Sequence, residues 1–200
     1  MDILTIINRA FSVIIALVLH ELAHGFVSYK LGDPTPKAEG RLTLNPLAHL
    51  DPIGTLCLLV FGFGWAKPVM IDYRHYKNKK LGTALVSLAG PCMNFLIAFI
   101  AVIGLKLCVV FNFEVLINFL YILFAINVGL GVFNLIPFPP LDGSKIVAAV
   151  LPSNLYDKWM YIERYGMFIL LALLYLDILT PVLSVAITLV QSLMFAVVGF

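Results

Sequence analysis

The sequence of 200 residues is 62% hydrophobic and only 12% charged, with a formal net charge of +2. Soluble domains are about half apolar and about a quarter charged, so the composition excludes a soluble domain and predicts a membrane protein that contacts a lipid bilayer. So small a net charge gives no indication of a nucleic-acid partner, and none is expected. The three cysteines show no paired spacing, which argues against a disulfide framework or a thiolate metal site.

Five apolar stretches predict helices that cross the membrane, because about 20 apolar residues span about 30 Å of hydrocarbon. The first is 3–29, and the next two, 81–110 and 115–136, flank the short break "FNFE". The fourth is about 165–179, which is short for a crossing. Thr180-Pro181 separates it from the fifth, the twenty residues that end at Phe200.

No internal repeat and no long polar stretch divides the chain, so we expect one domain over residues 1–200. The expected fold class is an all-α polytopic membrane protein. Its catalytic core of three helices covers about 3–150, and the C-terminal spans cover about 161–200.

The region between the first two spans, residues 30–80, is mixed in character. "GRLTLNP" and "WAKPVMIDY" alternate between Gly, Pro and Asn residues, which predicts short strands. "PIGTLCLLVFGFG" is apolar but too short to cross, so it either dips into the membrane and returns or lies at the interface. A re-entrant loop would need protein contacts or a watery chamber beside it.

Basic residues indicate the orientation, because cytoplasmic loops near spans are enriched in Lys and Arg. Eight of the thirteen lie between the first two spans: Lys30, Lys37, Arg41, Lys67, Arg74, Lys77, Lys79 and Lys80. This region is therefore predicted to face the cytoplasm. Residues 137–153 should face the same side, because the third span runs in the direction of the first.

Three polar side chains, His20, Glu21 and His24, stand inside the first span in "HELAH". Two histidines four residues apart share one face of a helix, where both imidazoles can bind one metal ion. A zinc ion with three protein ligands keeps a position open for water, and a neighbouring glutamate can take up and return a proton. The pattern indicates peptide hydrolysis, and a structural hydrogen-bonded cluster is the alternative.

A third metal ligand is expected from another part of the chain, since the position that would complete the longer zincin motif is Lys30. The better candidate is Asp142 in "NLIPFPPLDG", where prolines interrupt the helix and Gly143 permits a tight turn. The parallel direction of the first and third spans brings the histidines and Asp142 to one membrane face. Alternatively, Asp142 caps a helix that starts near Ser144.

The chain resembles the site-2 protease family of intramembrane zinc metalloproteases. The similarity rests on "HELAH", "NPLAHLDPIGT", "FGWAKPV", "AGPCMN" and "NLIPFPPLDG", which occur in this order between Ile14 and about Val150. We expect a minimal form of the family, without a PDZ or CBS domain.

The resemblance implies a metal and catalytic set. His20, His24 and Asp142 would bind one Zn²⁺ per chain, and Glu21 would be the general base. Asn134, eight residues before the aspartate, matches the family's asparagine for the substrate carbonyl or its oxyanion, and we assign it to catalysis.

Substrate contacts are predicted for four further residues. Asn94 matches a second polar position of the family, on the middle core span, and His49 lies next to the apolar segment and so near the expected mouth of the site. Val69 and Ile71 belong to a strand-like stretch that could pair with an extended substrate, because a cleaved helix must first unwind. Metal binding or loop bracing is left open for His49, His75, Asp51 and Asp72.

The resemblance predicts a zinc-dependent endopeptidase that cuts within or near the transmembrane segments of a protein substrate. The expected location is a cell membrane, the plasma membrane of a prokaryote, with the site open to the cytoplasm. The alternative is a non-catalytic homologue that binds membrane helices, against which Glu21 argues. A transporter should carry polar groups along several spans, and a di-iron site needs more carboxylates. The sequence predicts no particular oligomeric state.

Overall fold

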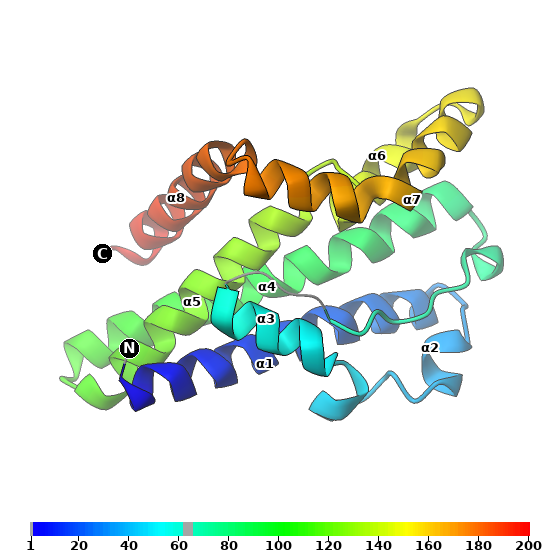
Figure 1. The fold of residues 1–200 in the computed structure, drawn as a ribbon. Coiled ribbons are helices and arrows are strands. Elements are labelled where there is room, and N and C mark those ends of the chain that lie inside the picture. The colour runs from blue at the N-terminus through cyan, green and yellow to red at the C-terminus, as the bar shows by residue number, and fades with distance from the viewer. Residues whose placement is uncertain (1, 62–65) are drawn as a thin grey trace.

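The computed structural model describes residues 2–61 and 66–200, which form an all-α fold (Figure 1). Within these residues, four helices are long and apolar enough to cross a membrane: α1 (Ile3–Lys30), α4 (Lys79–Val110), α5 (Glu114–Asn134) and α8 (Leu179–Val198). The predicted class of an all-α polytopic membrane protein is confirmed, and the three core helices lie where the sequence predicts them.

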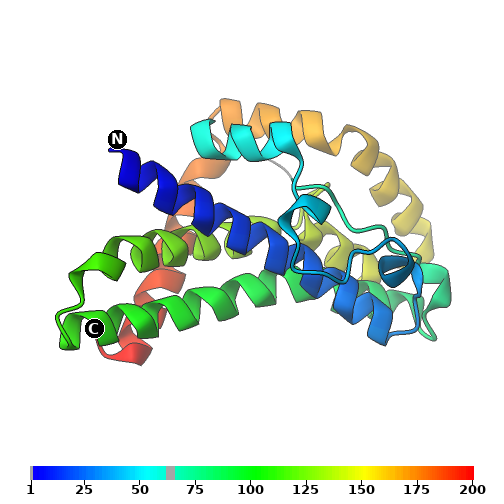
Figure 2. The same ribbon diagram turned by 90° about the horizontal axis from the view of Figure 1, so that it is seen from below.

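The core lies between α4 and α5, which form an antiparallel pair with α1 packed along it (Figures 1 and 2). Ala98 and Ala101 are fully buried and let the helices approach closely, and Phe124 of α5 fills the space between them. Farther along, a Cβ at Gly131 would lie 2.7 Å from the Phe95 ring, so glycine is needed for this packing distance. α8 lies across the outside of the same pair.

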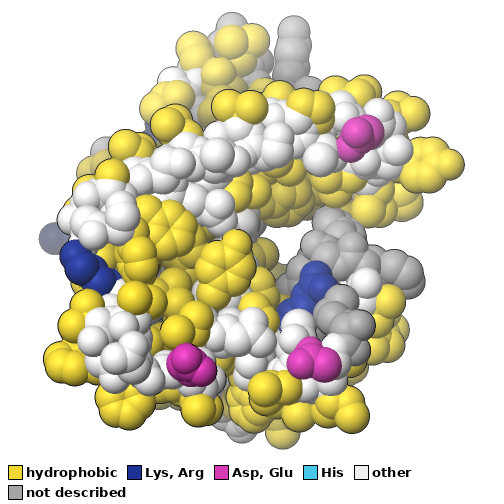
Figure 3. Space-filling model, turned by 90° about the vertical axis from the view of Figure 1, so that its left-hand side faces the viewer, with side chains coloured by type: hydrophobic (Ala, Val, Ile, Leu, Met, Phe, Trp, Pro, Cys, Tyr) yellow, Lys and Arg dark blue, Asp and Glu magenta, His cyan; other side chains and the backbone are white. Residues whose placement is uncertain are grey.

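Hydrophobic side chains cover most of the end of the molecule that holds both termini, with a few isolated charges (Figure 3). From this end α1 and α5 run in the same direction, towards α2 (Thr35–Ala38), while α4 returns (Figure 1). The C-terminal end of α5 and the turn after it therefore lie beside the second half of α1.

The C-terminal helices differ in their bounds from the prediction. The stretch predicted at 165–179 is the apolar half of a longer helix, α7 (Ser153–Tyr175). The break follows at Asp177, which has φ 57°, and the Thr-Pro pair lies in the first turn of α8 instead of before it. Proline is tolerated there because the first N–H groups of a helix have no acceptor within it.

The predicted strands in "GRLTLNP" and "WAKPVMIDY" are not formed in the described residues, which contain only an isolated antiparallel bridge between Leu50 and Ala66. Pro46 and Pro68 lack the N–H that a ladder needs, and no neighbouring strand is available to either stretch. Residues 67–72 belong to no helix or strand and run as an open stretch of chain (Figure 1), in which the N–H of Lys67 donates to the carbonyl of His49 at 2.9 Å. Trp65, where the second predicted strand begins, lies outside the described residues.

The apolar segment of the connecting region is helical. It forms α3 (Pro52–Phe61), whose first turn Asp51 caps by accepting a 2.8 Å hydrogen bond from the N–H of Gly54. The last residues of the apolar segment, 62–64, lie outside the described residues. Single turns of 3₁₀ helix at Pro46–Ala48 and Tyr73–His75 complete the connection.

Candidate metal centre

The predicted metal ligands meet at one point. His20 and His24 lie one turn apart on the buried face of α1, and Asp142 begins α6 (Asp142–Val150), after the turn that follows α5. The two Nε2 atoms are 3.0 Å apart, and Oδ2 of Asp142 lies 3.1 Å from that of His24 and 3.3 Å from that of His20. Among the described residues, these three form the cluster able to hold a metal ion.

The turn between α5 and α6 fixes the position of Asp142. A Cβ at Gly143 would lie 2.4 Å from the carbonyl oxygens of Leu135 and Ile136, so glycine lets α6 begin this close to the end of α5. The helix starts at Asp142 itself, with Leu141 as its N-cap and no side-chain capping bond. The alternative in which Asp142 caps a later helix is therefore wrong, and the carboxylate is directed at the histidines instead.

Hydrogen bonds behind the rings determine which nitrogens face the centre. Nδ1 of His24 lies 2.7 Å from the carbonyl oxygen of Val86, which can only accept, so Nδ1 donates and Nε2 presents a lone pair. Nδ1 of His20 lies 2.6 Å from Oδ1 of Asn94 and donates in the same way.

A buried chain of amides fixes the orientation of Asn94. Nδ2 of Asn127 donates to the carbonyl of Leu123 at 2.8 Å, so its Oδ1 accepts the 3.0 Å hydrogen bond from Nδ2 of Asn94. Nδ2 of Asn94 also faces the carbonyl of Ala16 at 3.5 Å, which leaves its Oδ1 for His20. Both asparagines are fully buried. This series of hydrogen bonds thus runs from the backbone of α5 to the ring of His20.

The donor set fits a zinc ion. Two imidazole lone pairs and a carboxylate oxygen face one another at 3.0–3.3 Å, which is repulsive without a proton or a cation between them. Zinc bonds of about 2.0–2.1 Å in tetrahedral geometry place neighbouring ligands about 3.3 Å apart. Three protein ligands leave a fourth position open, as in catalytic zinc sites.

Gly90 is a residue of the centre that the sequence analysis missed. At this position α4 packs directly against the two rings, since a Cβ there would lie 2.4 Å from Nε2 of His24 and 2.6 Å from Nε2 of His20. It lies within "AGPCMN", and the following Pro91 stands inside the helix. Any larger side chain at Gly90 would occupy the place of the rings.

Glu21 lies beside the centre and is half-buried. Its Oε2 accepts a 3.0 Å hydrogen bond from the N–H of Val69, in the extended stretch of the connecting region. A cavity of about 160 Å³ opens next to Glu21 and Val69. Its lining includes His20, Glu21, His24, Asp142, Asn134, Val69, Ile71, Tyr73, Ser87 and Lys145.

The structure brings some of the predicted substrate contacts to this cavity and not others. Val69 and Ile71 line it, as does Asn134, whose Nδ2 donates to the carbonyl of Leu130 at 3.1 Å. Asn94 does not line it and instead touches the centre through His20. His49 is buried away from it, with Nε2 donating to the carbonyl of Thr43 at 2.8 Å, because the connecting loop folds around its ring.

The other polar groups of the connecting region brace loops. Arg74 donates to Asp72 at 2.7 Å and holds the pKa of that carboxyl well below its usual range. Asp33, which the sequence analysis did not single out, is fully buried at the end of α1. Burial raises its pKa, but hydrogen bonds from Thr35, from the backbone of Asp72 and from Ser28 outweigh burial and lower it.

Tyr76 completes this buried group. Its hydroxyl lies 2.6 Å from Oγ of Ser28, which donates to Asp33 at 2.8 Å, so the tyrosine O–H is the donor to Ser28. Burial raises the pKa of Tyr76 to about 12. Gly82 of α4 allows the ring to pack against the helix, since a Cβ there would lie 2.4 Å from it.

Comparison with known proteins identifies relatives that are named as zinc metalloproteases. The profile of peptidase family M50 matches residues 109–174. YwhC of Bacillus subtilis, named as a candidate zinc metalloprotease, is 43% identical over 169 residues, which is 81% of this chain and 77% of YwhC. Rip2 of Mycolicibacterium smegmatis, named in the same way, is 30% identical over 86% of this chain and 66% of its own length.

A third relative is named outright as a zinc metalloprotease. Zinc metalloprotease MJ0392 of Methanocaldococcus jannaschii is 34% identical over 144 residues, which is 70% of this chain and 33% of that protein. No solved structure gives a significant match.

Proposed function

Because this chain belongs to peptidase family M50, we propose that it is a membrane-embedded zinc endopeptidase that cleaves within or near the transmembrane segments of other membrane proteins. The observation that carries the proposal is the convergence of lone pairs from His20, His24 and Asp142 beside a carboxylate, Glu21. His20, Glu21 and His24 belong to α1, which is long and apolar enough to cross a membrane, and Asp142 follows α5, another such helix. We assign the cavity to the cytoplasmic side from the distribution of basic residues.

The proposed roles of the residues follow from their positions. His20, His24 and Asp142 would hold zinc, which supplies Lewis acidity towards a carbonyl and favours deprotonation of water. Glu21 takes the proton of the attacking water and delivers it to the leaving amine. Its hydrogen bond from the N–H of Val69 keeps the carboxylate facing the cavity.

Asn134 is assigned to the carbonyl oxygen of the bond being cut. Its side chain lines the same cavity as Glu21, and an amide N–H directed at the developing negative charge stabilises that charge most in a site that excludes water. In the structure this amide donates to the carbonyl of Leu130, so binding of substrate would exchange one acceptor for another.

A transmembrane substrate must unwind before it is cut, because a helix keeps its carbonyls in internal hydrogen bonds. The extended residues 67–72 run beside Glu21 and offer a surface along which an unwound segment can lie. Val69 and Ile71 of this stretch line the cavity.

The test is Glu21→Gln, compared with the wild-type protein and with Glu114→Gln, an exposed glutamate at the far end of α5. Both variants should hold one zinc per chain. Cleavage should fall about 10²–10⁴-fold in Glu21→Gln alone, because only this variant loses the base.

Mass spectrometry of new protein termini in membranes that carry each form measures this cleavage. Products seen with wild type and Glu114→Gln, and absent with Glu21→Gln, support the proposal. Equal activity in Glu21→Gln, or cutting by zinc-free protein, would contradict it. A non-catalytic homologue would bind membrane helices and give no product with any form.

A further inference from the structure

A second cavity adjoins the candidate site, between α1, α5 and α7. It has a volume of about 160 Å³ and shares His20, Glu21, Asn134 and Pro140 with the first cavity. The rest of its lining is apolar: Leu17, Ala66, Leu130, Phe133, Leu141, Met167 and Leu170. The base and the oxyanion candidate therefore stand between a polar chamber and an apolar one.

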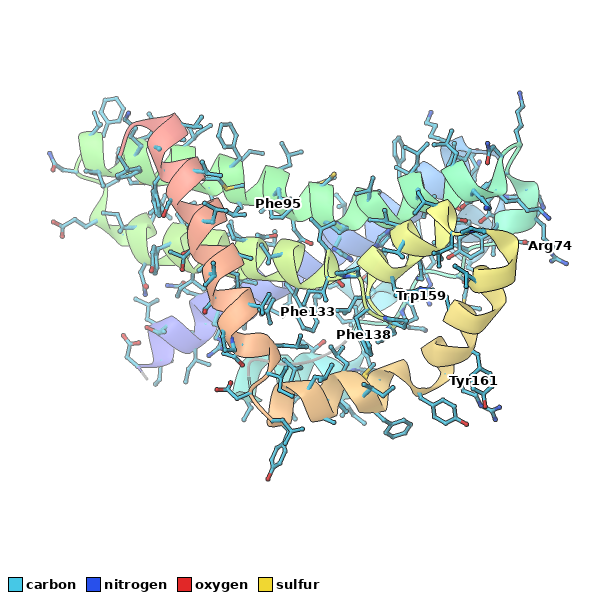
Figure 4. The ribbon with its side chains drawn as sticks, turned by 90° about the horizontal axis from the view of Figure 1, so that it is seen from above. Arg74, Phe95, Phe133, Phe138, Trp159 and Tyr161 are labelled. Carbon is cyan, nitrogen blue, oxygen red and sulfur yellow. The ribbon has the colours of Figure 1, made fainter. Side chains whose placement is uncertain are left out.

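The walls of the apolar chamber are held in place by the surrounding packing. Leu17, Leu141 and Leu170 are at most 7% exposed, so their positions are set by their neighbours. Phe133 lies between α5 and α7 in the view of Figure 4. Met167 is 38% exposed and forms the side that opens outward.

Two contacts fix α7 against the turn that carries Asp142. Nε1 of Trp159 donates to the carbonyl of Ser144 at 3.1 Å. A Cβ at Gly166 would lie 2.6 Å from the carbonyl oxygen of Pro139, so α7 packs directly on this turn. The apolar chamber is thus a built part of the fold, bounded by the loop that positions the metal ligand.

The size and chemistry of the chamber match one side chain. An apolar cavity of about 150 Å³ accepts a molecule of the size of benzene, so this one has room for a leucine, methionine or phenylalanine side chain. It offers too few polar partners for a charged group, which would be buried at high cost.

An extended substrate can place the side chain of only one of the two residues that flank the cut bond in the apolar chamber. Side chains of an extended peptide alternate between two faces, so if one enters the apolar chamber its neighbours point towards the polar cavity. Because Glu21 and His20 line both chambers, the side chain that enters belongs to a residue flanking the bond that is cut.

We propose that the chamber formed by Leu130, Phe133, Leu141, Met167 and Leu170 is a specificity subsite that selects a large apolar side chain on one residue flanking the scissile bond. This inference rests on the proposed endopeptidase function and names the substrate feature that it recognises. The residue on the other side of the bond is not selected by this chamber.

The experiment uses the purified, zinc-loaded full chain in detergent and a mixture of synthetic peptides with all side chains represented at each position. Mass spectrometry locates the cut bonds. With wild type, Leu, Ile, Met and Phe should exceed Ala and Gly about tenfold or more at one flanking position, as expected when an apolar pocket is left partly empty.

Two variants change the chamber in opposite directions. Leu130→Phe makes it smaller and should shift the preference towards Ala and Ser, whereas Phe133→Ala enlarges it and should admit Trp and Tyr. Leu189→Phe, the same change as the first on the exposed face of α8, should keep the wild-type preference. Zinc binding is measured for each variant to show that it retains its fold. If Leu130→Phe fails to bind zinc, Met167→Phe is used in its place.

The outcomes separate this inference from the function on which it rests. Cleavage with no apolar preference at either flanking position, or a preference that both size variants leave unchanged, overturns the subsite and leaves the endopeptidase standing. Absence of any cleavage by zinc-loaded wild type overturns the endopeptidase and the subsite together.

Discussion

At the scale of single residues, Gly90 tests the geometry of the centre without altering a ligand. Replacing glycine by alanine inside a helix ordinarily stabilises it by about 1 kcal/mol. Here the added methyl group would lie 2.4 Å from Nε2 of His24 and 2.5 Å from Cε1 of His20. We expect Gly90→Ala to remain folded but to bind zinc about 100-fold more weakly, measured by competition with a chelator.

The matched control is Gly129→Ala on α5, where an added Cβ meets nothing within 4 Å. It should bind zinc like wild type. Wild-type affinity in Gly90→Ala would contradict the placement of the two rings.

Asn127 provides a second prediction at this scale, because it reaches the centre through Asn94 and His20. Asn127→Leu removes the acceptor of a buried amide and lets Asn94 turn away from the ring. Loss of such a supporting hydrogen bond typically lowers metal affinity 10–100-fold. We expect a fall of this size in chelator competition, with partial rescue in Asn127→Asp, which keeps an oxygen acceptor.

Asn118→Leu makes the same change at an exposed position of α5 and should leave zinc affinity unchanged. If Asn127→Leu also binds zinc like wild type, the amide chain does not hold His20 in place.

These residues also show what the sequence could predict at this scale. His20 and His24 were predictable because a spacing of four puts them on one helix face, and the turn chemistry of "PPLDG" singled out Asp142. Gly90 and Asn127 act through contacts between helices, which no local pattern encodes. Asn127 left one signal, an amide in the middle of an apolar span, which is costly unless it has a buried partner.

At the scale of elements, the extended residues 67–72 are held against α1 by Asp33. Its Oδ2 accepts from the N–H of Asp72 at 2.9 Å, three residues after the Val69 N–H that donates to Glu21. Asp33→Asn changes one of the two acceptor oxygens into a donor, so the backbone N–H of Asp72 or that of Thr35 loses its acceptor. An unsatisfied buried group costs about 1–3 kcal/mol, so the stretch should detach more often.

The predicted result for Asp33→Asn is faster proteolysis within 67–72 and about tenfold slower cleavage of substrate, with zinc content unchanged. Asp72→Asn is the control, because it weakens only the pairing with Arg74 and His75, which is exposed enough to contribute little, and keeps the backbone N–H that donates to Asp33. Equal proteolysis of the two variants would rule out this clamp.

The pH dependence of the clamp has a definite sign. The pKa of Asp33 is lowered below its ordinary value of 3.8 in the folded protein. Its contribution to stability is therefore complete above about pH 5 and is lost as the pH falls towards the lowered value. The proteolysis rate of wild type should accordingly be the same at pH 7 and pH 5.

The strand predictions in this region failed for a physical reason. Alternation in "WAKPVMIDY" does reflect two faces, since Val69 is buried and Met70 exposed. A strand also needs a neighbouring strand. Here the carboxylates of Glu21 and Asp33 accept the backbone hydrogen bonds that a neighbouring strand would otherwise accept. Side chains acting as backbone partners cannot be foreseen from periodicity.

At the scale of the whole molecule, the direction of the spans was predictable and decided the site. An odd number of crossings between the histidines and Asp142 would have placed them at opposite ends. In the structure α1 and α5 are parallel (Figure 1), and this brings the histidines of α1 and Asp142, which follows α5, together. The bounds of α7 were less predictable, because its first half is polar enough to resemble a loop.

The orientation in the membrane is a prediction at this scale. Lys77→Cys, before α4, and Phe113→Cys, after it, place exposed thiols at opposite ends, in a protein whose three native cysteines are replaced by alanine. An impermeant maleimide should label the first only in inverted vesicles and the second only in intact spheroplasts. The reverse pattern would place the cavity outside the cell.

The most direct test of the central claim is zinc K-edge X-ray absorption on the purified full chain, with His24→Ala measured beside it. We predict one zinc per chain, with two imidazole nitrogens and carboxylate oxygen at about 2.0–2.2 Å and no sulfur, and loss of that zinc in the variant. A spectrum with sulfur ligands, or full zinc retention in His24→Ala, would contradict the assignment of His20, His24 and Asp142.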